Sequence, residues 1–291
     1  MPDRSQHDNL KSFLNRQAVK VLAVCSGKGG VGKTNVAANV ALAMAAKHHN
    51  VCLLDADVSL ANVDVLLGLQ PRFNLSHVVH GEIDLEAAVL KAPHGLRIVP
   101  ASSGNFSMTD LAPAGQAAII QAFGQMSDQP DVLVIDTAAG ISPGVARFVQ
   151  AAQHAVVVVC DEPASLTDAY ALIKVFSRNY GISHFQVITN MSTSNAAGRL
   201  LFDKLNRVAE RYLDVVLRHL GDVPRDEYLV KAVQQQRAVV DSYPNSASGN
   251  AFRRIAGAVE RLPAPTRSRG GIEFFFERLF VNERQGQGAV V

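Results

Sequence analysis

The sequence has little sulfur and few aromatic side chains. It contains no tryptophan, only three cysteines in 291 residues, and 6% aromatic residues overall. Cys25, Cys52 and Cys160 lie inside or at the ends of apolar runs, and no two of them form a C-x-x-C pair. This pattern argues against a disulfide framework and against a zinc or iron–sulfur site. We expect three buried structural thiols in a reducing cytosol.

The chain also lacks long hydrophobic runs and a large excess of charge. No run reaches the roughly 18 apolar residues of a membrane span, and the first residues show no basic-then-apolar signal pattern. Basic and acidic side chains nearly balance, which leaves a net charge of +2. These absences predict a cytoplasmic protein and disfavour a dedicated nucleic-acid binder, so direct DNA binding is not expected.

Short apolar runs alternate with helix-compatible segments along most of the chain. This alternation is typical of βαβ units, in which a parallel sheet is buried on both faces. With 48% hydrophobic residues, we expect a single doubly wound α/β domain with a mostly parallel central sheet flanked by helices. The strand-like runs are 19–25, 51–54, 97–99, 132–135, 155–160, 185–189 and one near 215–220, and the helical segments are 33–47, 113–126, 143–153, 165–180, 196–213, 229–237 and 251–262.

The segment that follows the first apolar run carries the strongest motif. It satisfies the phosphate-loop pattern G-x-x-x-x-G-K-[ST] and stands between a predicted strand and a predicted helix. In such a loop the backbone N–H groups close around phosphate oxygens, and the helix that follows offers its positive end to the same anion. Lys33 suits the β- and γ-phosphates and the Thr34 hydroxyl suits Mg²⁺. The predicted nucleotide-binding residues here are Gly27, Lys28, Gly29, Gly30, Val31, Gly32, Lys33 and Thr34.

Three aspartates follow strand-like runs: Asp55 and Asp57 after the second run, and Asp136 after the run that ends at 135. An aspartate after a strand is often only a helix cap or a turn former. In an open parallel sheet, however, the carboxyl ends of the strands form the ligand-binding edge, which here also carries the phosphate loop. Asp136 therefore fits a Mg²⁺-holding carboxylate, usually acting through water.

The early lysine of the loop, Lys28, makes the motif more specific. The segment Lys28-Gly29-Gly30-Val31-Gly32-Lys33-Thr34 resembles the deviant Walker A motif of the MinD/ParA family of ATPases. In that family the early lysine reaches the partner's phosphates across a nucleotide-sandwich dimer, as an arginine finger does in trans. The resemblance implies an ATP hydrolase with catalytic residues Lys28, Lys33 and Asp57, and with Thr34, Asp55 and Asp136 at Mg²⁺. The plain alternative for Lys28 is a solvated loop lysine.

The same resemblance extends to loops further along the chain. Asp136-Thr137-Ala138-Ala139-Gly140 is similar to the family's second switch, in which Gly140 approaches the γ-phosphate. Asn190 stands where the family reads the adenine edge, and Pro224 and Asp226 belong to a loop that packs on the other side of the base. Ordinary turns at these positions are the alternative.

Within the family, several segments look most like the flagellum-number regulators of the FlhG/FleN branch. They are Leu60–Leu69, Arg97–Gly104, Cys160–Lys174 and Lys231–Val239. The resemblance implies a slow, partner- or dimer-stimulated ATPase switch with ATP as substrate and Mg²⁺ as cofactor. It also implies an ATP-dependent homodimer that antagonises the master flagellar transcription activator and opposes the SRP-type GTPase FlhF, with FlhF and flagellar C-ring components as further partners.

The C-terminal region contains an amphipathic pattern. Ile272, Phe275, Phe276, Leu279 and Phe280 fall on a single helical face. This face predicts a helix with two states. It is docked on the domain as core when nucleotide is absent, and it is released as a membrane-targeting helix when ATP drives dimerisation, giving peripheral inner-membrane association. The predicted organisation is a polar tail (1–18), an ATPase domain (19–262), a breaker-rich linker (263–271), the amphipathic helix (272–284) and a short tail (285–291).

Three other functions share many of these features. A division-site regulator of the MinD type has every predicted catalytic residue. A DNA-partitioning ATPase of the ParA type needs salt-sensitive DNA binding, which the balanced charge does not favour. A nucleotide-stabilised binding module with negligible hydrolysis is the non-enzymatic alternative. The segment Asp8–Leu14 lies where some relatives carry a D-Q-A-x-x-L-R activator of FlhF, but only Asp8 matches, so GTPase activation is not predicted.

Overall fold

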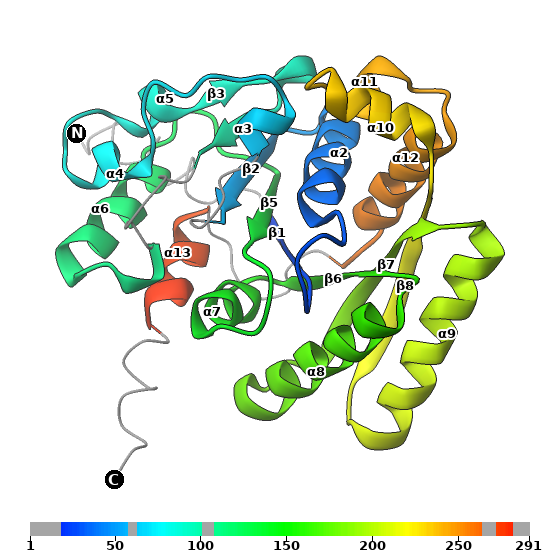
Figure 1. Cartoon of the computed structure of the whole chain (residues 1–291). Coiled ribbons are helices and arrows are strands. Elements are labelled where there is room, and N and C mark those ends of the chain that lie inside the picture. The colour runs from blue at the N-terminus through cyan, green and yellow to red at the C-terminus, as the bar shows by residue number, and fades with distance from the viewer. Residues whose placement is uncertain (1–18, 58–62, 101–107, 264–271, 282–291) are drawn as a thin grey trace, which may run out of the picture.

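A parallel sheet forms the centre of the molecule (Figure 1). The computed structural model describes residues 19–57, 63–100, 108–263 and 272–281. In this part the sheet has eight strands in the order β3-β4-β2-β5-β1-β6-β7-β8, and all neighbours are parallel except β3 and β4. The strands are β1 (Lys20–Cys25), β2 (Val51–Ala56), β3 (Leu90–Lys91), β4 (Arg97–Val99), β5 (Val132–Thr137), β6 (His154–Cys160), β7 (His184–Ser192) and β8 (Val216–Pro224).

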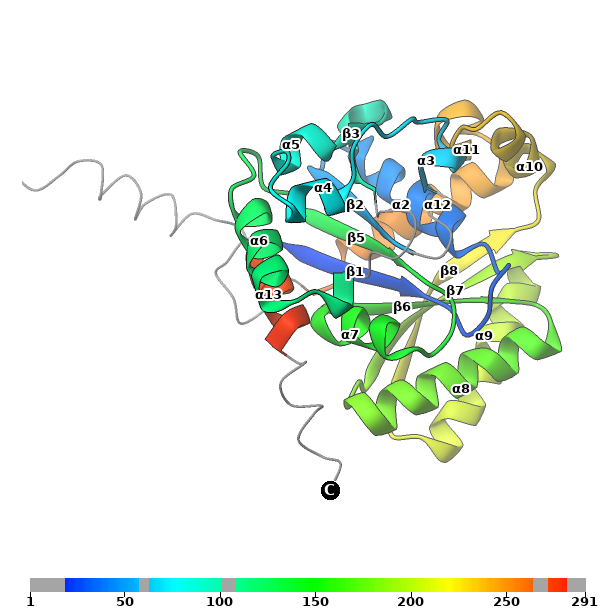
Figure 2. The ribbon, with the colours of Figure 1, turned by 60° about the vertical axis from the view of Figure 1, so that its left-hand side comes forward.

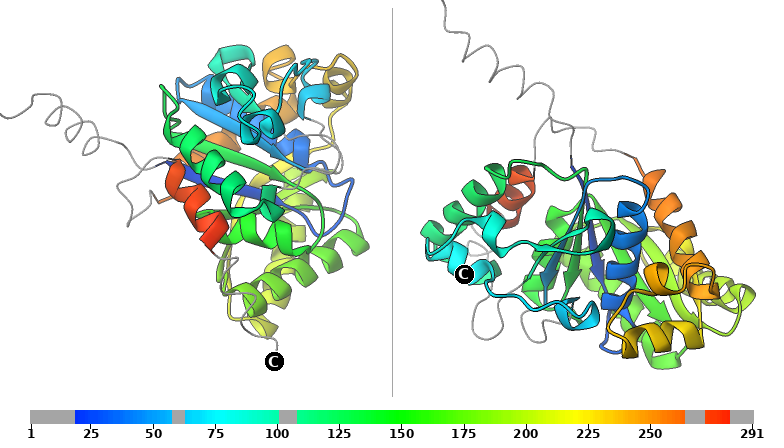
Figure 3. Two further views of the ribbon diagram at one scale, coloured as in Figure 1. Left: turned by 90° about the vertical axis from the view of Figure 1, so that its left-hand side faces the viewer. Right: turned by 90° about the horizontal axis from the view of Figure 1, so that it is seen from above.

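Helices cover both faces of the sheet, which confirms the predicted α/β class (Figure 3). One core cluster joins α2, α11 and α12 to the sheet, and two others lie on the opposite face under α4–α6 and α13 and under α7–α9. Central strands read as continuous apolar runs because both of their faces are buried. The helices are α2 (Lys33–Ala45), α3 (Val63–Leu66), α4 (Leu75–Val79), α5 (Leu85–Ala88), α6 (Pro113–Gly124), α7 (Pro143–Ala151), α8 (Pro163–Tyr180), α9 (Asn195–Tyr212), α10 (Glu227–Gln234), α11 (Val239–Ser242), α12 (Ala247–Glu260) and α13 (Glu273–Val281).

The three cysteines are buried and free, as the sequence predicted. Burial raises the pKa of Cys25 and of Cys52 to about 12 in each case, because the interior disfavours a thiolate. Such thiols are packing groups.

The C-terminal helix α13 lies against α6 and α7 (Figure 2). Its five predicted apolar residues, Ile272 to Phe280, are at most 5% exposed, and the Phe276 ring stacks on Phe123 of α6 with 4.1 Å between centroids. Of the two predicted states of this helix, the structure therefore shows the docked one. No helix in the described ranges is long and apolar enough to cross a bilayer.

Several short elements were not predicted. The two-residue β3 and the four- or five-residue helices α3, α4, α5 and α11 are too short to show a period in the sequence. Helix α8 begins at Pro163, two residues earlier than predicted, because proline suits the first turn of a helix. The predicted tails 1–18 and 285–291 and nearly all of the linker lie outside the described residues.

Candidate nucleotide site

The phosphate loop joins the end of β1 to the start of α2, at the carboxyl edge of the sheet. Gly30 and Gly32 have φ values of +79° and +83°, which only glycine adopts readily. Gly32 stands at the N-cap of α2 and supplies no side-chain cap. The first N–H groups of α2 therefore point to the loop without a capping side chain, which is the arrangement that binds an anion.

Gly32→Ala tests this loop. A Cβ at this position would lie 2.4 Å from Nδ2 of Asn190, and the left-handed conformation alone costs an L-residue about 1–2 kcal/mol. We expect the variant to lose at least about 1–2 kcal/mol of unfolding free energy in urea and to bind ATP at least tenfold more weakly. Gly29→Ala is the matched control for stability, because nothing lies within 4 Å of its Cβ position. Equal unfolding free energies of the two variants, or wild-type ATP affinity of Gly32→Ala, would contradict this view of the loop.

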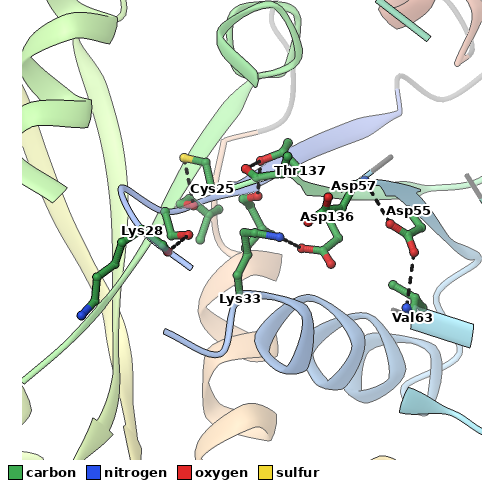
Figure 4. Close-up of polar contacts among 12 residues, drawn as sticks. Cys25, Lys28, Lys33, Asp55, Asp57, Val63, Asp136 and Thr137 are labelled. Carbon is green, nitrogen blue, oxygen red and sulfur yellow. Dashed lines mark hydrogen bonds and ion pairs between the residues drawn. The ribbon is translucent and has the colours of Figure 1, made fainter. Parts of the chain in front are cut away.

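Lys33 and Asp136 form a buried ion pair at the centre of the site (Figure 4). The Lys33 ammonium donates to Oδ1 of Asp136 at 2.7 Å, and the two side chains are 7% and 1% exposed. Burial raises the pKa of Asp136, while the Lys33 charge and the Thr34 hydroxyl oppose that rise. Oδ2 of Asp136 is buried and has no hydrogen-bond partner within the described residues. A carboxylate oxygen that lacks a donor beside a threonine hydroxyl is a fitting ligand pair for Mg²⁺.

Asp55 lies near the end of the neighbouring strand β2, in register with Asp136 of β5, and Asp57 directly follows β2. The Asp55 carboxylate accepts the N–H of Asp57 at 3.1 Å and the N–H of Val63 at 3.3 Å, so it ties down both ends of the loop before α3 (Figure 4). The negative charge of Asp57 contributes to the raised pKa of Asp136. All three predicted aspartates are thus brought to one edge, while residues 58–62 lie outside the described part.

Lys28 is held within its own subunit by a residue that the sequence analysis did not single out. Its ammonium lies 2.5 Å from Oε2 of Glu162, at the N-cap of α8, and this contact raises the pKa of Lys28 and lowers that of Glu162. Figure 4 shows the Lys28 side chain pointing away from Lys33 and Asp136. Glu162 follows β6 at the same sheet edge. The reasoning used for the aspartates, that an acidic residue after a strand lies at the ligand-binding edge, could therefore have identified it.

The segment 136–140, predicted as the second switch, contacts the strand β1 and the start of the phosphate loop. The N–H of Gly140 donates to the carbonyl of Ser26 at 2.8 Å, and the Thr137 hydroxyl donates to the carbonyl of Val24 at 2.9 Å. Gly140 has a φ of +97° and therefore needs glycine. These contacts connect the end of β5 to the loop.

Asn190 is brought against the phosphate loop from the end of β7. Its Nδ2 donates to the carbonyl of Val31 at 2.8 Å, and its Oδ1 is buried without a partner in the described part of the chain. Asp226 has a clear structural use: its carboxylate caps α10 through the N–H of Tyr228 and also binds the N–H and hydroxyl of Ser248 in α12. The carboxylate of Asp226 therefore fixes the loop that contains Pro224, and contact of that loop with a base stays a prediction.

A match to a protein-family model identifies the family of this chain. The model described as ParA, NUBPL iron-transfer P-loop NTPase, matches residues 17–260. The chain belongs to the MinD/ParA family of P-loop ATPases. This MinD/ParA chain contains no C-x-x-C pair, and its described residues hold no group of three or more His, Cys, Asp or Glu that could bind a metal.

Individual relatives of this MinD/ParA chain agree with the family. The chain is 51% identical over 277 residues to the antiactivator FleN of Pseudomonas aeruginosa, covering 95% of this chain and 99% of the relative. It is 32% identical to the flagellum site-determining protein YlxH of Helicobacter pylori, covering 93% of each chain. Among solved structures, the MinC:MinD cell division complex of Aquifex aeolicus has the same fold, with a TM-score of 0.68 at 24% identity and with 86% of this chain and 99% of that chain covered.

Proposed function

We propose that the chain is an Mg·ATP-dependent dimerising switch that limits flagellar number by antagonising a flagellar transcription activator. The main support for this proposal is the 51% identity to a protein named as an antiactivator, over nearly the full length of both chains. A relative named for flagellum site determination is 32% identical, but relatives named for septum site determination reach 29–35%, so the 51% match carries the distinction between the branches.

Each residue of the site has a separate role in the proposed switch. Lys33 binds the β- and γ-phosphates of its own subunit, and Lys28 those of the partner subunit. Thr34 and Asp136 hold Mg²⁺, which when bound neutralises charge on the phosphates. Asp57 orients the attacking water, Gly140 approaches the γ-phosphate, and Asn190 and the loop around Pro224 flank the base. The solved structure of MinD from Pyrococcus horikoshii, which has the same fold, is a complex with Mg-ADP, and this supports binding of a Mg-nucleotide at the site.

We also propose that α13 targets the membrane when ATP drives dimerisation. In its docked position the helix buries five large apolar side chains, each contributing roughly 1.5–3 kcal/mol, but the ordering of helix and linker offsets much of that gain. A single helix should therefore bind lipid marginally, and two on one dimer gain about 10²–10⁴ in avidity. Opposition to the GTPase FlhF and contact with flagellar C-ring components complete the proposed role.

Phe123→Ala tests the docked state of α13 without changing the helix. Phe123 is the α6 ring on which Phe276 stacks, so its loss weakens docking and should increase sedimentation with anionic vesicles several-fold in the absence of ATP. Phe176→Ala is the matched control, because Phe176 is equally buried but belongs to the core cluster under α8. Deletion of residues 272–280 should abolish sedimentation. Vesicle binding that survives the deletion would contradict the role of α13.

Deletion of the gene tests the function itself. We expect the deletion strain to carry many flagella and to show raised expression from an activator-dependent flagellar promoter. Wild-type protein should restore both, and the Lys33→Ala variant should restore neither. Minicells with normal flagellation would identify a division-site regulator instead, and plasmid loss with salt-sensitive DNA binding would identify a partitioning ATPase.

A further inference from the structure

Glu162 is the N-cap residue of α8, but its side chain does not cap the helix. Its backbone is fixed, because its N–H donates to the carbonyl of Cys160 at 2.8 Å and its carbonyl accepts the N–H of Leu166 at 3.1 Å. N-cap positions favour short polar residues, whose oxygen reaches the first N–H groups of the helix. The Glu162 carboxylate is not used in this way, and its ion-pair partner is Lys28.

The phosphate loop and the start of α8 are packed closely enough to bring Lys28 to Glu162. Gly27 lies against α8, since a Cβ at this position would collide with the carbonyl oxygen of Asp168. The Ser26 hydroxyl donates to the carbonyl of Lys28 at 2.9 Å, which fixes the backbone of the loop at this lysine. The backbones on both sides of the ion pair are therefore held in place by other contacts.

The Lys28–Glu162 contact is weak enough to be exchanged for another. The two side chains are 29% and 51% exposed, and an exposed ion pair contributes little because water screens it and two long side chains lose rotamer freedom. The pKa of Glu162 is lowered by Lys28 and also by the charge of Arg225, whose Nε donates to the carbonyl of Met191 at 3.1 Å. The carboxylate thus keeps a cationic neighbour when Lys28 leaves.

The Lys28 ammonium has two competing uses. The proposed function requires it to reach the phosphates of the partner subunit, whereas here it binds a carboxylate of its own subunit and points away from Lys33 and Asp136 (Figure 4). A carboxylate at 2.5 Å offsets the positive charge that the lysine offers to a phosphate, and it fixes the side chain in the wrong direction. A symmetric dimer must break this contact in both subunits.

We propose that Glu162 is a positioning residue that holds Lys28 in the monomer and thereby opposes ATP-dependent dimerisation. This inference rests on the proposed function, because it needs Lys28 to act across the dimer. The contact sets a threshold and does not block the dimer, since each exposed pair shifts the equilibrium by only a factor of about two to three. A triphosphate carries more negative charge than a diphosphate, so Lys28 leaves Glu162 for ATP more readily than for ADP. Glu162 therefore favours return to the monomer after hydrolysis.

Glu162→Gln tests this restraint on the full-length chain by two measurements. The first is acylation of Lys28 by N-hydroxysuccinimidyl acetate without nucleotide, followed by peptide mass spectrometry with Lys47 as the internal reference. Because Glu162 raises the pKa of Lys28, the variant should hold more free amine at a fixed pH and react several-fold faster at this lysine alone. The second is the dimer dissociation constant with Mg²⁺ and a non-hydrolysable triphosphate, from sedimentation velocity over a dilution series. It should fall about two- to tenfold, because two contacts are removed per dimer.

Asp168→Asn is the matched control for the loss of charge. Asp168 also raises the pKa of Lys28 through its charge, but no ion pair joins the two among the residues that the structure describes. This variant removes the same formal charge from α8 and should change the dimer constant by less than about twofold. Glu162→Gln should unfold at the wild-type urea concentration, because the side chain that it changes does not cap α8.

An unchanged acylation rate of Lys28 in Glu162→Gln would overturn the restraint. An unchanged or weaker dimer in a variant whose Lys28 reacts faster would also overturn it, and so would an equal effect of Asp168→Asn on the dimer constant. A wild type that stays monomeric with the triphosphate would refute the proposed function, and this inference with it. A wild-type dimer whose dissociation constant Glu162→Gln does not alter would refute the role of Glu162 alone.

Discussion

Lys28→Ala is expected to retain ATP binding and to lose ATP-dependent dimerisation. In its own subunit the Lys28 side chain pairs with Glu162 and points away from the Lys33–Asp136 pair, so its removal leaves the local phosphate site intact (Figure 4). In the dimer it would neutralise phosphate charge across the interface. Truncating one member of such a buried charge pair costs about 2–5 kcal/mol, and a trans-acting cation is worth about 10³–10⁵ in turnover.

Sedimentation velocity with a non-hydrolysable triphosphate measures the dimer of the Lys28 variant, and a fluorescent ATP analogue measures binding. Lys47→Ala is the matched control, because Lys47 is also a solvent-accessible lysine paired with a glutamate, Glu260, at 2.9 Å. Lys47 follows α2, at the sheet edge opposite the phosphate loop. A Lys28 variant that dimerises and hydrolyses ATP as well as the Lys47 variant does would rule out the composite site.

Asp57→Ala is expected to bind ATP and to dimerise, but to lose about 10²–10⁴-fold in single-turnover hydrolysis, as is typical when a group that positions water is removed. Asp57 lies close enough to Asp136 for its charge to affect the Asp136 pKa. It is therefore near the predicted position of the γ-phosphate.

Asp64→Ala provides the comparison for Asp57. Asp64 lies in the short helix α3, and its carboxylate accepts the N–H of Val65 at 2.8 Å. Its loss should weaken the helix start slightly and leave the hydrolysis rate within a few-fold of wild type. Wild-type turnover in the Asp57 variant would remove Asp57 from the catalytic residues. Negligible turnover in the wild type itself would favour a nucleotide-stabilised binding module.

The sequence predicted those parts of the site that depend on local patterns. A glycine-rich loop between a strand and a helix predicts a phosphate-binding conformation, and the parallel topology alone places an aspartate that follows an apolar run at the sheet edge. For this reason Lys33, Asp55 and Asp136 could be grouped before their contacts were known. The amphipathic spacing of Ile272 to Phe280 likewise specified which face of α13 is buried.

Other features depend on contacts between residues far apart in the chain, which no local pattern reports. Glu162 meets Lys28 across 134 residues, and the Asp226 carboxylate is used by Ser248, 22 residues away in α12. The two-residue strand β3 exists only because β4 pairs with it. Spacing also could not choose between the docked and released states of α13, because the same apolar face serves protein core and lipid.

Light scattering of the full-length wild type, with Mg²⁺ and either ADP or a non-hydrolysable triphosphate, tests the central claim most directly. The account predicts the monomer mass of 31.2 kDa with ADP and twice that mass with the triphosphate. A mass of 31.2 kDa in both conditions would contradict the idea that two subunits join through the nucleotide.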